Sequence, residues 1–331
     1  MINLSKRLPI GAVVAAIALL PAAAQAQGPP PPTSTNGKPV VTVASGVATP
    51  TAFAFAGSTV FAGSGPAEQG SAPTGLFTLA NGTATKVPNT PPVVFGLAWH
   101  KSKLYVSTGP SIVAFSGWDG TKFASSKTIS APKKPFRGFN GLAFGPNGKL
   151  YAGVALDEKH DHKADHSPHA QAVVSMTAAG KHLRTVAKGL RQPFQLTFVG
   201  SGGRNPYVSV LSQDKGKIPK DAIVVAKRGQ DYGFPTCKWG KPKTCKGFAK
   251  PKILLPKHAS PMGIGAIGRT LYVSLFGGLG DGKPVVVHIP AGGGTPKPLL
   301  QGFVAPVVAL GVHAGMVYVG DLTGTIYAVR A

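Results

Sequence analysis

The sequence predicts an all-β protein in which six similar sheets form a ring, and three observations lead to this prediction. Glycine and proline are abundant, with 44 and 31 residues in a chain of 331, and both residues interrupt helices and favour turns. Apolar residues make up 43% of the chain and recur in short regular blocks, which argues against disorder. A short aromatic motif then repeats along the chain at a nearly regular spacing.

The repeated motif is a triplet with an aromatic residue at its centre that follows a tight turn. The aromatic residues of successive triplets stand 44, 46, 56, 65 and 46 residues apart. A period of about 40 to 50 residues is typical of β-propeller blades, each of which contains several short strands. Six triplets predict a six-bladed β-propeller over residues 38–331: Val60-Phe61-Ala62, Leu104-Tyr105-Val106, Leu150-Tyr151-Ala152, Pro206-Tyr207-Val208, Leu271-Tyr272-Val273 and Val317-Tyr318-Val319.

The third unit shows how strands are expected to follow one another within a blade. Residues 141–144 and 149–154 are apolar and flank the turn sequence Gly145-Pro146-Asn147-Gly148, which predicts an inner hairpin. Residues 172–176 and 183–187 supply an outer pair of strands. The inner strands are almost continuously apolar, as expected for strands that are packed on both faces.

The two ends of the propeller are expected to pair with each other. After the sixth triplet, residues 325–329 form a third strand without a fourth, and residues 40–44 form a lone strand near the start. We expect the N-terminal strand to complete the last blade and close the ring, since closure leaves no long sheet edge exposed. The two longest spacings predict insertions around the third, fourth and fifth blades, where functional loops are expected.

The first 26 residues are predicted to be a signal peptide. Lys6 and Arg7 precede an apolar run over residues 8–20, and Ala24-Gln25-Ala26 is a suitable cleavage site. The run is shorter than the roughly 20 residues of a membrane span. We therefore expect an exported, periplasmic or extracellular monomer, in which residues 27–37 form a disordered, proline-rich leader.

The chain contains two cysteines, Cys237 and Cys245, in a loop rich in proline, glycine and lysine. Because export places them in an oxidising compartment, we predict that they form a local disulfide.

The net charge of the chain is +24, and basic residues are concentrated between Asp214 and Lys257. This excess predicts attraction to polyanions, which include acidic polysaccharides, anionic lipid surfaces and nucleic acid. The basic segment from Lys215 to Lys252 contains few aromatic residues for base stacking, so no specific nucleic-acid partner is predicted. A solvated basic surface without a partner is the alternative.

Four motifs follow one another in the second half of the chain: Gly189-Leu190-Arg191-Gln192-Pro193, Gly229-Gln230-Asp231-Tyr232-Gly233-Phe234-Pro235, His258-Ala259-Ser260-Pro261-Met262-Gly263 and Gly320-Asp321-Leu322-Thr323-Gly324-Thr325-Ile326-Tyr327. Their order and spacing resemble the glucose/sorbosone dehydrogenase family of six-bladed propellers. The resemblance extends from about Phe136 to the C-terminus. It implies an exported quinoprotein that oxidises a sugar hydroxyl by hydride transfer to pyrroloquinoline quinone (PQQ), with calcium as a second cofactor.

The resemblance also implies site residues, although several depart from the family pattern. Arg137 stands where the family has its catalytic histidine, and an arginine stays protonated and cannot act as that base. Intact and degenerate activity therefore both remain open. The remaining implied residues are His258 as a second catalytic candidate, Arg191 and Gln192 for the quinone, and Asp214 and Asp221 for calcium.

Two other function classes compete with the dehydrogenase. The first is a non-catalytic binding propeller that holds an anionic partner, either a polysaccharide or a lipid surface, through the basic segment. The second is a gluconolactonase-like hydrolase, because Asn140-Gly141-Leu142-Ala143-Phe144 resembles a metal-binding segment of that group. The carboxylates that would join Asn140 are absent at the matching positions Val94 and 192–195.

Residues 160–169 contain four histidines and two aspartates. Imidazoles with nearby carboxylates are suitable ligands for zinc, copper or nickel. A solvated, flexible loop is the competing interpretation of such a tract. The histidines predicted to bind a transition metal are His160, His162, His166 and His169.

Overall fold

The computed structural model describes residues 30–66, 73–200, 202–213 and 219–331. The predicted signal peptide and Asp214 lie outside these ranges. Within them, the helical elements are two 3-10 helices, η1 (Glu158–His160) and η2 (Pro242–Cys245), and the rest is strands and loops. No helix in this described part of the chain is long and apolar enough to cross a membrane.

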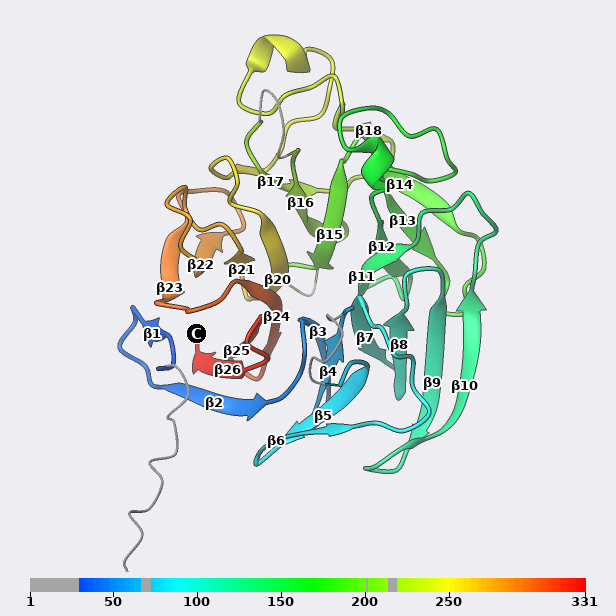
Figure 1. The fold of residues 1–331 in the computed structure, drawn as a ribbon. Helices are drawn as coiled ribbons and strands as arrows, with labels where there is room; N and C mark the ends of the chain where they lie inside the picture. The colour runs from blue at the N-terminus through cyan, green and yellow to red at the C-terminus, as the bar shows by residue number, and fades with distance from the viewer. Residues whose placement is uncertain (1–29, 67–72, 201, 214–218) are drawn as a thin grey trace, which may run out of the picture. The chain divides into compact units, whose positions relative to one another are not determined.

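The strands form six four-stranded antiparallel units, called blades 1 to 6 here (Figure 1). Blade 1 contains β3 (Pro50–Ala56), β4 (Thr59–Ser64), β5 (Leu76–Ala80) and β6 (Gly82–Lys86). Blade 2 contains β7 (Gly96–His100), β8 (Lys103–Ser107), β9 (Ile112–Trp118) and β10 (Phe123–Ser130). Blade 3 contains β11 (Phe139–Phe144), β12 (Leu150–Val154), β13 (Val173–Met176) and β14 (Arg184–Lys188).

The second half of the chain repeats this arrangement. Blade 4 contains β15 (Gln192–Thr197), β16 (Tyr207–Leu211), β17 (Ala222–Val225) and β19 (Ile253–Leu254). Blade 5 contains β20 (Pro261–Ile267), β21 (Thr270–Leu275), β22 (Val285–Pro290) and β23 (Lys297–Gln301). Blade 6 contains β24 (Val307–His313), β25 (Met316–Asp321), β26 (Ile326–Arg330) and β2 (Val40–Ser45).

The central aromatic residue of every repeated triplet lies on the second strand of its blade. Most of these side chains are buried in the hydrophobic clusters between neighbouring blades, and Phe61 is fully buried. The regular aromatic spacing therefore reflects one interior position that recurs in each blade. These positions are Phe61, Tyr105, Tyr151, Tyr207, Tyr272 and Tyr318.

The predicted closure of the ring is confirmed. Strand β2 pairs with β26 in antiparallel register, with Val40 opposite Val329 and Thr42 opposite Tyr327. The first strands of the six blades also contact one another in a closed cycle, from β3 through β7, β11, β15, β20 and β24 back to β3. A short parallel pairing of β2 with β6 connects blade 6 to blade 1.

Serine side chains on the second strands of blades 2 and 4 bond to the next blade. Ser107 Oγ donates a hydrogen bond of 2.6 Å to the carbonyl of Asn140, and Ser209 Oγ donates one of 2.6 Å to the carbonyl of Met262. Both serines are fully buried. Because an unpaired buried polar group is costly, these bonds favour one packing of neighbouring blades.

Gln195 crosses the centre of the ring. Its Nε2 atom lies 3.2 Å from the carbonyl oxygen of Thr51 in blade 1 and 3.1 Å from that of Phe95, which precedes blade 2. A side chain at Gly141 would overlap Gln195, since a Cβ atom there would stand 2.0 Å from Oε1. Gln195 therefore ties blade 4 to the opposite side of the ring.

The C-terminal part of the predicted leader is ordered in the structure. Residues 27–37 were expected to be disordered, but β1 (Thr33–Ser34) pairs with the outer strand β23, with Thr33 opposite Gln301. The Thr35 amide also donates to the carbonyl of Leu299 at 2.9 Å. The prediction of disorder is therefore wrong from Thr33 onward, because the open edge of β23 offers backbone partners to this segment.

Two long insertions interrupt the blades at the places that the longest spacings indicated. The first, residues 155–172, connects β12 to β13 and is called the His-Asp loop here. The second, residues 226–252, connects β17 to β19 and is called the cationic insertion. In Figure 1 the yellow part of the cationic insertion extends away from blade 4.

Candidate functional site

Most of the described residues that the sequence analysis selected lie at one rim of the ring. Arg137 precedes β11, Arg191 precedes β15, and His258 precedes β20, so all three stand where a first strand begins. Asp221 precedes the third strand β17, and the His-Asp loop follows the second strand β12. In an antiparallel sheet the start of the first and third strands and the end of the second meet at the same edge. The topology therefore brings these segments to a common rim.

Arg137 is held by two carboxylates of the His-Asp loop. Its Nε lies 2.6 Å from Asp165 Oδ2, and its second terminal nitrogen lies 3.2 Å from Asp165 Oδ1, which makes a bidentate pair. The other terminal nitrogen lies 3.0 Å from Asp157 Oδ2. The hydrogen bond to Asp165 raises the pKa of Arg137. The residue at the family's base position is thus a cation fixed in ion pairs, and it cannot accept a proton.

Arg191 is neutralised by the same loop. Its Nε donates to Asp161 Oδ1 at 2.8 Å, and a terminal nitrogen contacts the same oxygen. The side chain is 8% exposed, and its other terminal nitrogen lies 3.4 Å from the carbonyl oxygen of Leu211. The cation that the family resemblance assigns to the quinone is therefore bound to a carboxylate of the chain itself.

The His-Asp loop is ordered by its own hydrogen bonds. Gln171 Nε2 donates to the carbonyl of Lys163 at 2.9 Å, and the Asp165 amide donates to Gln171 Oε1 at 3.3 Å. The Ser167 amide donates to Asp165 Oδ1 at 2.8 Å. Burial alone would raise the pKa of Asp165, but the bonds from Arg137 and Ser167 outweigh burial and lower it well below its usual range. Asp165 is therefore a carboxylate at ordinary pH.

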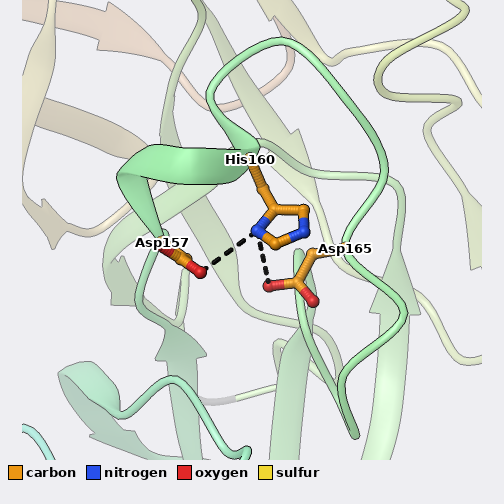
Figure 2. A group of neighbouring side chains, drawn as sticks. All are labelled: Asp157, His160 and Asp165. Atoms are coloured by element: carbon orange, nitrogen blue, oxygen red, sulfur yellow. Dashed lines mark hydrogen bonds and ion pairs between the residues drawn. The ribbon is translucent and has the colours of Figure 1, made fainter.

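The four histidines of the predicted metal tract have different surroundings. His160 Nδ1 lies 3.1 Å from Asp157 Oδ2 and 3.7 Å from Asp165 Oδ2 (Figure 2). His162 Nε2 instead lies 2.9 Å from Asp161 Oδ2. His169 Nδ1 bonds Thr185 Oγ1 at 2.8 Å, and burial lowers the pKa of His169. His166 is exposed. The tract thus does not converge as a group, and only His160 faces two carboxylates.

Asp221 is a buried structural carboxylate. It is 3% exposed, and each oxygen accepts a backbone hydrogen bond, from the Ser212 amide at 2.7 Å and from the Ser260 amide at 2.8 Å. These bonds tie blade 4 to the loop that carries His258, whose side chain is exposed at the rim.

Gln192 begins β15 opposite Leu211 and is half-buried.

These surroundings do not fit PQQ and calcium. Holding the quinone carboxylates requires free cationic groups, but Arg137 and Arg191 are engaged by Asp165 and Asp161. Calcium requires several accessible oxygen ligands, but both oxygens of Asp221 accept backbone amides.

The hydrolase hypothesis receives no support from the surroundings of Asn140. The Asn140 side chain is 5% exposed, and its Nδ2 donates to the carbonyl of Pro193 at 2.8 Å. The amide therefore fixes blade 3 against blade 4.

The cationic insertion is fastened to blades 3 and 4 along its length. Strand β18 (Gln230–Asp231) pairs in parallel with β14, and the Phe234 amide donates to the carbonyl of Gly189 at 3.0 Å. Tyr232 is 2% exposed, and its hydroxyl donates to the carbonyl of Val225 at 2.7 Å. Burial raises the pKa of Tyr232 to about 12. The first arm of the insertion is thus anchored by a buried aromatic residue.

The predicted disulfide between Cys237 and Cys245 is present and closes the tip of the insertion. Beside it, Lys238 Nζ donates to Gln213 Oε1 at 2.7 Å, and burial lowers the pKa of Lys238. The other basic side chains of the insertion are exposed, and the described residues place no acidic partner within ion-pair distance of them. These exposed side chains are Lys227, Arg228, Lys241, Lys243, Lys246, Lys250 and Lys252.

Sequence reasoning missed the residues that neutralise the rim. Asp161 and Asp165 were seen as part of a histidine-rich tract, yet they bind Arg191 and Arg137, which stand 30 and 28 positions away. The number of acidic residues was an available signal, because few occur in this basic chain and several lie between residues 157 and 165.

No protein-family model and no curated protein matches the chain, but solved structures match its fold. The PQQ-bound aldose sugar dehydrogenase of Streptomyces coelicolor aligns at a TM-score of 0.70 and 18% identity, over 90% of this chain and 99% of its own. A glucose dehydrogenase-type oxidoreductase of Thermus thermophilus aligns at a TM-score of 0.64 and 17% identity, over 88% and 100%. A gluconolactonase of Xanthomonas campestris aligns at 0.61 and 14%, over 92% and 95%. The chain therefore has the β-propeller fold of these sugar dehydrogenases, and the gluconolactonase matches the same fold of this chain.

Proposed function

We propose that the protein is an exported, non-catalytic propeller that binds an acidic polysaccharide through its cationic insertion. The observation that carries the proposal is an ordered surface of exposed lysines without acidic partners among the described residues. The insertion is already ordered in the free protein. Binding a polyanion therefore loses less conformational entropy than binding by a flexible loop would.

The ion pairs at the rim support the non-catalytic half of the proposal. Asp161 and Asp165 provide to Arg191 and Arg137 the negative charge that a quinone would otherwise provide. A bound quinone would have to displace both carboxylates and leave them without their cationic partners. Breaking a partly buried ion pair in this way is costly.

The chemistry of the insertion favours a polysaccharide over a lipid bilayer. Three of its aromatic side chains face inward, with Tyr232 and Trp239 in the hydrophobic cluster and Phe248 packed against it, and Phe234 is half-buried. Stable membrane attachment usually adds apolar insertion to charge. An insertion that offers charge alone is better suited to a hydrated polymer with sulfate or carboxylate groups.

The proposal is tested by affinity for a sulfated or carboxylated polysaccharide at low salt. The variant changes four exposed lysines of the insertion, K241Q, K243Q, K246Q and K250Q, and keeps the half-buried Lys238. The matched control removes the same charge from blades 1 and 2 through K86Q, K103Q, K122Q and K127Q, which are also exposed. We expect the insertion variant to lose at least about tenfold in affinity and the control to lose much less.

Two results would contradict the proposal. Equal losses in both quadruple variants would show that binding follows net charge and not the insertion. Stronger binding to phosphatidylglycerol vesicles than to any polysaccharide would replace the polymer with a lipid surface. Titration with PQQ and calcium, followed by dye reduction with aldoses, tests the catalytic alternative, and micromolar PQQ binding would restore it.

A further inference from the structure

Three potential metal ligands converge at the base of the His-Asp loop. Asp157, His160 and Asp165 each offer one ligand atom, and these atoms all lie within 4.8 Å of one another. We call this group the Asp–His–Asp cluster. Figure 2 shows that the imidazole of His160 points between the two carboxylates. The cluster is separate from the cationic insertion, so the inference drawn from it does not depend on the proposed function.

The loop places these side chains through two independent features. Asp157 is the N-cap of η1, where its carboxylate accepts the Lys159 amide at 3.1 Å, and His160 follows in the same short helix. Asp165 comes from the returning part of the loop, which Gln171 holds at both sides. The approach of the three side chains therefore follows from the ordered backbone of the loop.

The spacing of the three atoms is close to that of metal ligands. His160 Nδ1 lies 3.1 Å from Asp157 Oδ2 and 3.7 Å from Asp165 Oδ2. Zinc binds imidazole nitrogen and carboxylate oxygen at about 2.0–2.2 Å, so two ligands of one ion stand roughly 3–4 Å apart. One imidazole and two carboxylates suit zinc and its neighbours, whereas calcium and magnesium prefer oxygen alone.

Arg137 would compete with a metal ion for the carboxylates of this site. Its guanidinium contacts the same Oδ2 atoms of Asp157 and Asp165 that would bind a metal ion. The cluster is open to solvent on one side, since the side chains of Asp157 and His160 are 21% and 22% exposed, whereas that of Asp165 is 3% exposed. An entering cation would share or displace the contacts of Arg137, and the positive charge of Arg137 would weaken its binding.

We propose that the Asp–His–Asp cluster binds one divalent transition-metal ion, for which zinc is the probe, and that Arg137 sets the affinity by competing for the two carboxylates. The site has three protein ligands, which leaves a fourth tetrahedral position for water. Binding would fasten the two arms of the His-Asp loop together at the rim.

The test is calorimetric titration of the mature chain with zinc chloride, supported by the visible absorption of bound cobalt(II). We expect one ion per chain. Replacement of a ligand, in H160A or D165N, should weaken binding by about tenfold or more. R137Q should bind zinc more tightly than the wild-type chain, because the competing cation is gone. Thermal unfolding of each variant shows whether the fold is kept.

A matched control separates the cluster from the remaining histidines. The triple variant H162Q, H166Q and H169Q keeps the cluster and should bind zinc as the wild-type chain does. Absence of zinc binding to the wild-type chain, unchanged affinity in H160A, or loss of binding in the triple variant would each overturn the proposal. Weaker binding in R137Q would overturn the role assigned to Arg137.

Discussion

At the scale of single residues, two ion pairs set the chemistry of the rim, Arg137 with Asp165 and Arg191 with Asp161. Both arginines were selected from motifs that resemble the family pattern, and in the structure they stand just before β11 and β15. Their ion pairs with Asp165 and Asp161 could not be predicted, since these depend on how an irregular loop folds back. The family resemblance therefore pointed to residues of the rim and carried no information about the carboxylates that bind them.

Gln195 is predicted to stabilise the ring. Replacement in Q195A removes the donor to the carbonyls of Thr51 and Phe95, and each buried carbonyl left without a partner costs about 1–3 kcal/mol. We expect a lower free energy of unfolding in urea, with Q301A as the control because Gln301 is an exposed glutamine on β23. Equal stability of the two variants would show that Gln195 does not connect the blades.

The ion pair of Asp165 is predicted to stabilise the folded protein at neutral pH and to lose this effect in acid. Its folded pKa is lowered, so the stabilisation by its ion pair is fully present above the unfolded pKa of about 3.9 and is lost as pH falls toward the folded pKa. The difference in Tm between the wild-type chain and D165N should be constant from about pH 5 to 7 and shrink below about pH 4. A difference that persists unchanged to pH 3 would contradict this assignment.

At the scale of elements, strands were predictable and their irregular extensions were not. The hairpin of residues 141–154 appears as β11 and β12, and the outer pair appears as β13 and β14, because apolar blocks separated by glycine turns specify short strands. The pairing of β1 was missed, because a proline-rich segment carries no strand pattern and the partner edge lies far away in sequence.

The closing strand is predicted to stabilise the whole ring. Deletion of residues 27–45 removes β1 and β2, leaves β26 without its partner, and exposes a sheet edge. We expect a markedly lower Tm and broader unfolding by calorimetry. Deletion of residues 27–31 is the control, because it spares both strands. Unchanged thermal unfolding after the longer deletion would refute the closure.

The disulfide is predicted to hold the tip of the cationic insertion in its binding shape. The double variant C237S and C245S should lose about 2 kcal/mol of stability and bind polysaccharide less tightly, although no charge has changed. Denaturant unfolding and affinity at fixed salt measure the two effects. Two titratable thiols in the denatured, unreduced exported protein would show that the bond does not form.

At the scale of the whole molecule, the fold was predictable from periodicity while the function was not. Six aromatic repeats indicate six blades, since each repeat must bury one face against its neighbours. The same ring serves proteins described as dehydrogenases and as a gluconolactonase, so the fold leaves the chemistry to the loops. Here the loops give a rim neutralised by carboxylates and an insertion that presents cations.

The net charge of +24 makes some attraction to any polyanion unavoidable, so a specific site is distinguished by where on the surface the polyanion binds. A polyanion bound by a defined cluster of cations releases a corresponding number of counterions, which sets the slope of log affinity against log salt. General attraction spread over the surface would make that slope insensitive to the choice of lysines.

The most direct test is therefore the salt dependence of affinity for one sulfated oligosaccharide, measured for the wild-type chain and the two quadruple lysine variants. We expect K241Q/K243Q/K246Q/K250Q to give a clearly shallower slope and K86Q/K103Q/K122Q/K127Q to keep the slope of the wild-type chain. Identical slopes for the two variants would contradict the claim that the cationic insertion is the binding site.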